Sequence, residues 1–189
     1  MSAQDPRPVI PEKYARALAG DDPVKVMAAS AARLRKLVGG LTERQAAQPP
    51  LPGKWSIKEI VAHLADGEII LGSRYRFAAA HDRPPLPGYD QDAFAARLGP
   101  LNARLADLLD AFEGARRANL LLLRRLPKEA WDRVGLHAER GEESIRTMVQ
   151  MYAGHDRHHM AQIATIRAGL FPAKARKRKS SARKGSRRR

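Results

Sequence analysis

Hydrophobic residues recur at intervals of three and four along four segments of the chain, which is the pattern of amphipathic α-helices. In the second segment, for example, Ile57, Ile60 and Leu64 fall on one face. Ser56 and Glu59 form a capping box at its start, because the hydroxyl and the carboxylate can each satisfy a free backbone N–H. The four predicted helices cover about residues 22–38, 56–80, 101–126 and 144–167.

The segments between these helices show no sustained alternation of polar and apolar residues, so we expect no β-strand. A Pro- and Gly-rich connection covers residues 81–100. Four helices of this length in one chain predict an all-α fold, a four-helix bundle. Residues 56–61 resemble residues 144–149, which suggests two related helix pairs arranged as two hairpins.

The predicted bundle covers residues 23–172, between an N-terminal extension (1–22) and a basic C-terminal segment (173–189). The composition agrees with one globular domain, since 43% of the 189 residues are hydrophobic and 29% are charged. The chain has no cysteine, which excludes disulfides, cysteine-ligated metals and a cysteine nucleophile. We find neither a signal-peptide pattern nor an apolar run long enough for a membrane span, so we expect a cytoplasmic protein.

The formal net charge of +15 is concentrated at the C-terminus. Residues 173–189 contain ten basic residues and no acidic one, whereas the rest of the chain has 25 basic and 20 acidic residues, a net charge of +5. A run of like charges repels itself and buries no apolar surface, so we expect this tail to be disordered. Such a tail can bind nucleic acid or another polyanion without sequence selectivity, or it can be an extension without a specific partner.

Three of the six histidines lie close together in the fourth predicted helix. A helix advances about 100° per residue, which places His155 and His159 one turn apart within the apolar stripe and His158 at its edge. Neutral imidazoles at positions i and i+4 can converge on one metal ion. The alternative is a pair of hydrogen-bonded core histidines, because a buried imidazole without a partner costs about 1–3 kcal/mol.

His63 lies in the second predicted helix, about 100° from the centre of its apolar stripe, so the helical phase leaves its direction open. A histidine in this position is either solvated or directed at a neighbouring helix of the bundle. In the second case it would be a third metal ligand. Three protein ligands leave coordination positions for water or substrate, as in catalytic metal sites.

Four polar residues near these histidines are candidates for supporting roles. Glu68 falls within the apolar stripe, so its carboxylate needs a partner, either an arginine on another helix or a metal site that it supports as an outer carboxylate or proton acceptor. Gln162 lies one turn beyond His159 in the same stripe. Asp66 and Asp156 are expected at the surface, although either can orient a ligand histidine.

Residues 53–68 (GKWSIKEIVAHLADGE), the Pro-rich connection and residues 155–162 (HDRHHMAQ) together resemble the DinB/YfiT-like family of metal-dependent enzymes. The resemblance covers most of the predicted bundle. It implies a four-helix bundle with a divalent metal ion held by one histidine of the second helix and two of the fourth. Carried over to this sequence, the implied ligands are His63, His155 and His159. The identity of the metal, whether zinc, nickel or iron, is left open.

This family includes thiol-dependent S-transferases, a mycothiol-dependent isomerase and metal-dependent hydrolases. The resemblance therefore implies an enzyme whose metal activates a low-molecular-weight thiol cosubstrate or water for attack on a small electrophilic substrate. Glu68 and Gln162 are the supporting candidates, and no catalytic side chain is identified. The alternatives are a protein that binds metal without catalysis, or one that binds nucleic acid or a polyanion through its basic tail. A homodimer formed through an apolar flank of the bundle is compatible with each.

Overall fold

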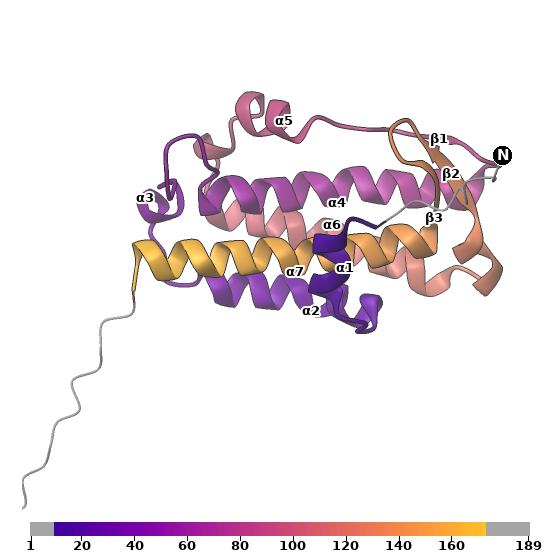
Figure 1. Cartoon of the computed structure of the whole chain (residues 1–189), viewed down its shortest axis with the longest axis horizontal. Coiled ribbons are helices and arrows are strands. Elements are labelled where there is room, and N and C mark those ends of the chain that lie inside the picture. The colour runs from indigo at the N-terminus through magenta and orange to yellow at the C-terminus, as the bar shows by residue number, and fades with distance from the viewer. Residues whose placement is uncertain (1–9, 173–189) are drawn as a thin grey trace, which may run out of the picture.

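The computed structural model describes residues 10–172, so the expectations for the basic tail (173–189) lie outside the described residues. Helices make up most of the described chain (Figure 1). The α-helices are α1 (Glu12–Leu18), α2 (Pro23–Val38), α3 (Glu43–Ala46), α4 (Ile57–Ala80), α5 (Gln91–Arg97), α6 (Leu105–Arg125) and α7 (Ile145–Leu170). Two 3₁₀ turns, η1 (Pro100–Asn102) and η2 (Lys128–Asp132), precede α6 and follow it.

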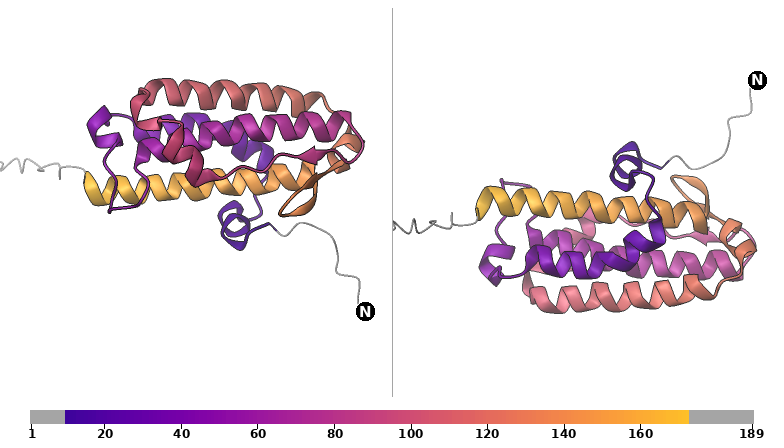
Figure 2. Two further views of the ribbon diagram at one scale, coloured as in Figure 1. Left: turned by 90° about the horizontal axis from the view of Figure 1, so that it is seen from above. Right: turned by 90° about the horizontal axis from the view of Figure 1, so that it is seen from below.

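The long helices α2, α4, α6 and α7 form a four-helix bundle, as predicted (Figures 1 and 2). Helix α4 packs against α6 and α7, and α2 packs against the same two helices. Helices α2 and α4, although consecutive in the bundle, therefore lie on one diagonal, and α6 and α7 lie on the other. The expected arrangement of two consecutive hairpins is wrong, because the connections 39–56 and 126–144 are long enough to cross the end of the bundle.

The helix starts follow the local signals in the sequence. Asp22 caps α2 by accepting hydrogen bonds from the backbone N–H groups of Val24 and Lys25, at 2.9 and 3.1 Å. The predicted capping box of α4 is present, with Ser56 N donating to Glu59 Oε2 at 2.7 Å. Helix α6 begins four residues later than predicted, because the residues before it form the turn η1.

Contrary to the expectation of no strand, three short strands form a small sheet at one end of the bundle (Figure 1). Strand β2 (Val134–His137) pairs in parallel with β1 (Pro85–Leu86) and antiparallel with β3 (Gly141–Ser144). Gly141, at φ 74°, adopts the left-handed conformation at the start of β3. These strands have two to four residues, which is too short for a readable alternation.

The apolar core consists of two clusters that occupy opposite ends of the bundle. One contains Met27, Leu71 and Met148, and the other contains Leu34 and Phe112. Between them, every long helix contributes buried polar side chains, which we call the polar layer. Its members are Ser30, His63, Glu68, Arg116, Asn119, His155, Asp156 and His159.

Helix α1, which lies in the predicted N-terminal extension and was not expected as a helix, crosses the middle of α7 on the outside of the bundle (Figures 1 and 2). The Arg157 guanidinium of α7 donates to the carbonyl oxygen of Leu18 at 3.0 Å and pairs with Asp21 at 2.5 Å. The crossing is close, because Gly154 of α7 lies directly under the backbone of Tyr14. Among residues 10–172, no helix combines the length and apolar character that crossing a membrane requires.

Replacing Gly154 with Ala is expected to lift α1 from the bundle. An added Cβ would stand 2.7 Å from the carbonyl carbon of Tyr14, and such overpacking costs about 1–3 kcal/mol. Urea unfolding measures the loss of stability, and hydrogen exchange of residues 12–18 measures the release of α1. Gly114→Ala is the matched control, since a Cβ there meets nothing within 4 Å and helix propensity favours alanine by about 1 kcal/mol. Normal protection of α1 in the Gly154 variant would contradict the prediction.

Candidate metal centre

Three histidines from two helices meet inside the bundle. His63 projects from the N-terminal third of α4, and His155 and His159 project from α7 one turn apart. All three side chains are buried, and a set of their ring nitrogens, one from each, lies within 4.8 Å of one another. The two Nε2 atoms of His63 and His155 are 2.9 Å apart. The packing of α4 against α7 thus directs His63 at its neighbours, which the helical phase alone left open.

Gln162 fixes the orientation of one histidine of this triad. Its Oε1 accepts a hydrogen bond from His159 Nδ1 at 3.0 Å. Because Nδ1 then carries the proton, Nε2 of His159 presents its lone pair. A hydrogen bond that sets the tautomer in this way is usual behind a metal-ligating histidine.

Burial keeps the triad neutral. It lowers the pKa of His63 to about 3, with a further contribution from His159, and it lowers that of His155 well below its ordinary value. Burial also lowers the pKa of His159, to about 4, although the hydrogen bond with Gln162 acts in the opposite direction. Neutral imidazoles with converging nitrogens are the donor set that Zn²⁺, Ni²⁺ and Fe²⁺ accept. The triad therefore fits a divalent metal ion.

The metal-free protein is expected to lose stability as the pH falls below about 6.5. The unfolded chain binds protons on these histidines near that pH, whereas the folded chain resists them down to about pH 3–4. The stability is therefore complete above the unfolded pKa and declines by up to about 1.4 kcal/mol per pH unit for each neutral histidine. Urea unfolding between about pH 7.5 and 5 measures the slope. His159→Gln should give a shallower slope, and equal slopes would contradict the prediction.

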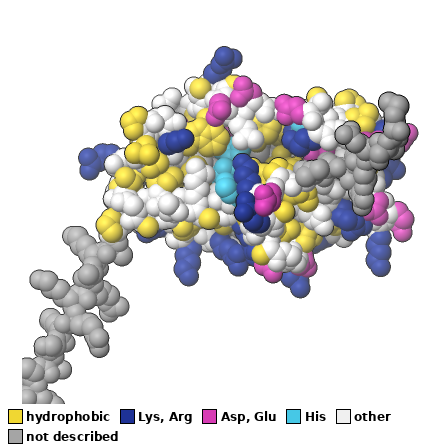
Figure 3. Space-filling model, viewed as in Figure 1, with side chains coloured by type: hydrophobic (Ala, Val, Ile, Leu, Met, Phe, Trp, Pro, Cys, Tyr) yellow, Lys and Arg dark blue, Asp and Glu magenta, His cyan; other side chains and the backbone are white. Residues whose placement is uncertain are grey.

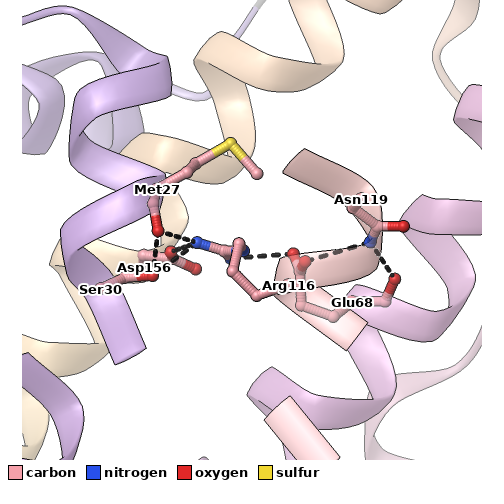
Figure 4. A network of polar contacts seen from close by, with 6 residues as sticks. All are labelled: Met27, Ser30, Glu68, Arg116, Asn119 and Asp156. Carbon is pink, nitrogen blue, oxygen red and sulfur yellow. Dashed lines mark hydrogen bonds and ion pairs between the residues drawn. The ribbon is translucent and has the colours of Figure 1, made fainter. Parts of the chain in front are cut away.

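Of the two interpretations of Glu68, the structure confirms the one in which its carboxylate pairs with an arginine on another helix (Figure 4). Its carboxylate lies 2.8 Å from Arg116 of α6, and it also accepts a hydrogen bond from Asn119. The expectation that Asp156 lies at the surface is wrong, because it is 2% exposed and pairs with the same guanidinium at 2.6 Å. Much of the circumference of α7 is buried, because α1, α2 and α4 all pack on it. Asp66 is half-buried.

A cavity of about 190 Å³ reaches the triad at His155. Its walls include side chains that the sequence analysis did not single out, because they come from irregular segments and the N-terminal extension. They include Tyr14 of α1, Tyr89 before α5 and Arg140 between β2 and β3. Figure 3 shows the molecule from the same side as Figure 1, and near the middle of this face histidine side chains reach the surface beside Lys and Arg side chains.

A four-helix bundle whose buried histidine triad fits a metal ion, beside a cavity, places the chain among helical proteins with a candidate metal centre. The sequence profile described as the DinB superfamily matches residues 27–163. The chain therefore belongs to the DinB superfamily.

Several relatives carry names that refer to metal-dependent hydrolysis. A protein of Oceanobacillus iheyensis, named as a candidate metal-dependent hydrolase, is 28% identical over 131 residues, which are 69% of this chain and 75% of that protein. The solved structure of YfiT from Bacillus subtilis is described as a candidate metal-dependent hydrolase with an unusual four-helix bundle topology. It matches with a TM-score of 0.72 and 23% identity, over 77% of this chain and 83% of YfiT.

A more distant similarity is to a mycothiol-dependent maleylpyruvate isomerase. Its structure matches with a TM-score of 0.58 and 13% identity, over 76% of this chain and 58% of the isomerase. At these identities the two solved structures show the shared bundle fold.

Proposed function

We propose that this protein is a metal-dependent enzyme in which His63, His155 and His159 hold a divalent ion, zinc, nickel or iron. The observation that carries the proposal is the convergence of three buried, neutral imidazoles beside a cavity that reaches one of them. When bound, such an ion lowers the pKa of a coordinated water or thiol and supplies a nucleophile at neutral pH. The names of the relatives support hydrolysis, through the metal-dependent hydrolases, and a thiol-dependent reaction, through the mycothiol-dependent isomerase.

The chain's own residues orient the ligands and shape the site. Gln162 holds the His159 ring through Nδ1. The ring of Trp55 lies 5.0 Å from that of His63, and the ring of Tyr14 lies 5.2 Å from that of His155. These aromatic side chains limit the access of water to the two imidazoles.

Two phenols of the cavity can donate hydrogen bonds to a substrate. Burial raises the pKa of Tyr89 and of Tyr152, so both hydroxyls keep their protons at neutral pH. A thiol nucleophile would have to arrive with a second substrate, since the chain has no cysteine.

Metal reconstitution with two substrate panels tests this function. The full-length protein is stripped with a chelator, reloaded with Zn²⁺, Ni²⁺ or Fe²⁺, and assayed with small esters and amides, and with small electrophiles plus a low-molecular-weight thiol. We expect turnover to rise by about tenfold or more on loading with the correct metal. The panel that responds separates hydrolysis from thiol transfer. Stoichiometric metal without turnover in either panel would favour a non-catalytic metal site, and no metal uptake would refute the proposal.

A further inference from the structure

Basic and phenolic side chains supply most of the lining of the cavity at His155, and no carboxylate lines it among residues 10–172. Pro11, Gln91 and Met151 complete the lining. Lys13 and Tyr14 come from α1, Arg140 comes from the turn between β2 and β3, and Tyr152 comes from α7. With about 190 Å³, the cavity is smaller than the sites of about 300–1,000 Å³ that hold drug-sized ligands. The space therefore suits a small molecule.

A buried cation lies directly behind the wall of this cavity. Arg74 of α4 is 1% exposed, and within residues 10–172 no carboxylate lies close enough to form an ion pair with it. Its guanidinium donates instead to the carbonyl oxygen of Pro87 at 2.9 Å and to the hydroxyl oxygen of Tyr152 at 3.0 Å. A buried charge without a counter-ion is costly, so this part of the protein favours an anion.

Tyr152 links the buried Arg74 to the cavity, because it lines the cavity and its hydroxyl contacts the guanidinium. Because its oxygen accepts from Arg74, its hydrogen is available to another acceptor, and the described part of the chain records none. Polarisation by a guanidinium strengthens the phenol as a donor. An anionic oxygen in the cavity is the acceptor that this arrangement suits best.

Two further cations come from the rim of the cavity. Lys13 lies on exposed α1 with its ammonium 4.8 Å from the ring of Tyr14, and in the described chain it has no ion-pair partner. Arg140 is held by buried Glu143 through Nε and Nη2, which leaves Nη1 for another acceptor. Lys13 is therefore the rim cation whose charge is not already matched.

We propose that this cavity binds a small organic carboxylate, with Lys13 and the Arg74–Tyr152 pair as its specificity-determining groups. The carboxylate would accept hydrogen bonds from Lys13 Nζ and from the Tyr152 hydroxyl. Because His155 lines the same cavity, the rest of the ligand would lie next to the metal centre. The inference names the substrate class of the proposed enzyme and rests on the proposed function for turnover, whereas the preference for anions is measurable by binding alone. Lys13 also lies outside the family match at residues 27–163, so this selectivity would belong to this chain's own N-terminal helix.

Isothermal titration with benzoate and with benzamide at constant ionic strength tests the proposal. The two probes have the same shape and differ in charge. The full-length protein is titrated both metal-loaded and metal-stripped, because a carboxylate can also bind a metal directly. We expect benzoate to bind about tenfold more tightly than benzamide in both forms, which is the effect of one charge-assisted hydrogen bond.

Lys13→Gln and Arg16→Gln form a matched pair, since each removes one positive charge from exposed positions of α1 and only Lys13 lines the cavity. Lys13→Gln should weaken benzoate binding about five- to tenfold and leave benzamide unchanged, whereas Arg16→Gln should change neither by more than about twofold. Tyr152→Phe, with its fold checked by circular dichroism, should also reduce the preference for benzoate. Equal affinity for both probes in the wild type, or equal effects of the two α1 variants, would overturn the proposal.

The metal content of the same samples separates this inference from the proposed function. A preference for benzoate that depends on Lys13 in a protein that takes up no metal would support the carboxylate site and refute the metal-dependent enzyme. A metal-loaded protein without such a preference would overturn the carboxylate site alone.

Discussion

The His155→Ala variant is expected to bind divalent metal more than about 100-fold more weakly than the wild type, beyond the 10–100-fold that loss of a supporting group costs. His155 is the residue at which the triad meets the cavity, and its Nε2 lies 2.9 Å from that of His63. Two remaining imidazoles cannot complete the set of three protein ligands typical of a catalytic site. Elemental analysis of untagged protein, purified without a chelating column, and competition with a chromophoric chelator measure the loss.

Two further variants of α7 complete this experiment. His158→Ala is the matched control, because His158 lies on the same turn outside the triad, and it should retain the metal. Gln162→Leu should fall between the two, with affinity reduced about 10–100-fold, because His159 loses the group that orients it. Equal metal contents of His155→Ala and His158→Ala would show that the triad is not the binding site.

The Arg116→Met variant is expected to lose about 3–5 kcal/mol of stability, as proteins do when one partner of a buried ion pair is removed. The guanidinium lies between the carboxylates of Glu68 and Asp156, both almost fully buried (Figure 4). Burial alone would lower the pKa of Arg116, but the two carboxylates raise it overall. Without the arginine, two acidic groups would remain in the core with no counter-charge.

Urea unfolding measures this loss against Arg117→Met, a neighbouring exposed arginine of α6 whose replacement should change stability by less than about 0.5 kcal/mol. Adding Glu68→Gln and Asp156→Asn to Arg116→Met should recover part of the loss, because the uncompensated charges are removed. A loss equal to that of Arg117→Met would contradict the prediction.

The sequence predicted the parts of the structure that depend on one helix at a time. The capping box at Ser56 and the apolar stripes identified the long helices. The phase of α7 separated His155 and His159 from His158. The direction of His63 depends on how α4 packs against α7, so it required either the family resemblance or the structure.

The remaining features depend on contacts between distant segments. Asp156 is buried because its partner, Arg116, comes from another helix, and no pattern within α7 reveals that partner. The packing of α1 on α7 depends on Gly154, which lies beneath the backbone of Tyr14, 140 residues earlier in the chain. The same applies to the cavity, whose walls come from four separate parts of the chain.

The polar layer also determines how far along the bundle axis each helix sits. Sliding α7 by one turn, about 5.4 Å, would still bring apolar side chains against apolar side chains at both ends. It would, however, carry Asp156 away from Arg116 and change which histidine of α7 lies opposite His63, leaving the Asp156 carboxylate without its partner in the core. The polar layer therefore opposes this shift of α7, whereas a purely apolar interior would tolerate it. One buried polar residue fixes the alignment of a coiled coil in the same way. The ion network beside the triad thus fixes the position of the three histidines along the axis of the bundle.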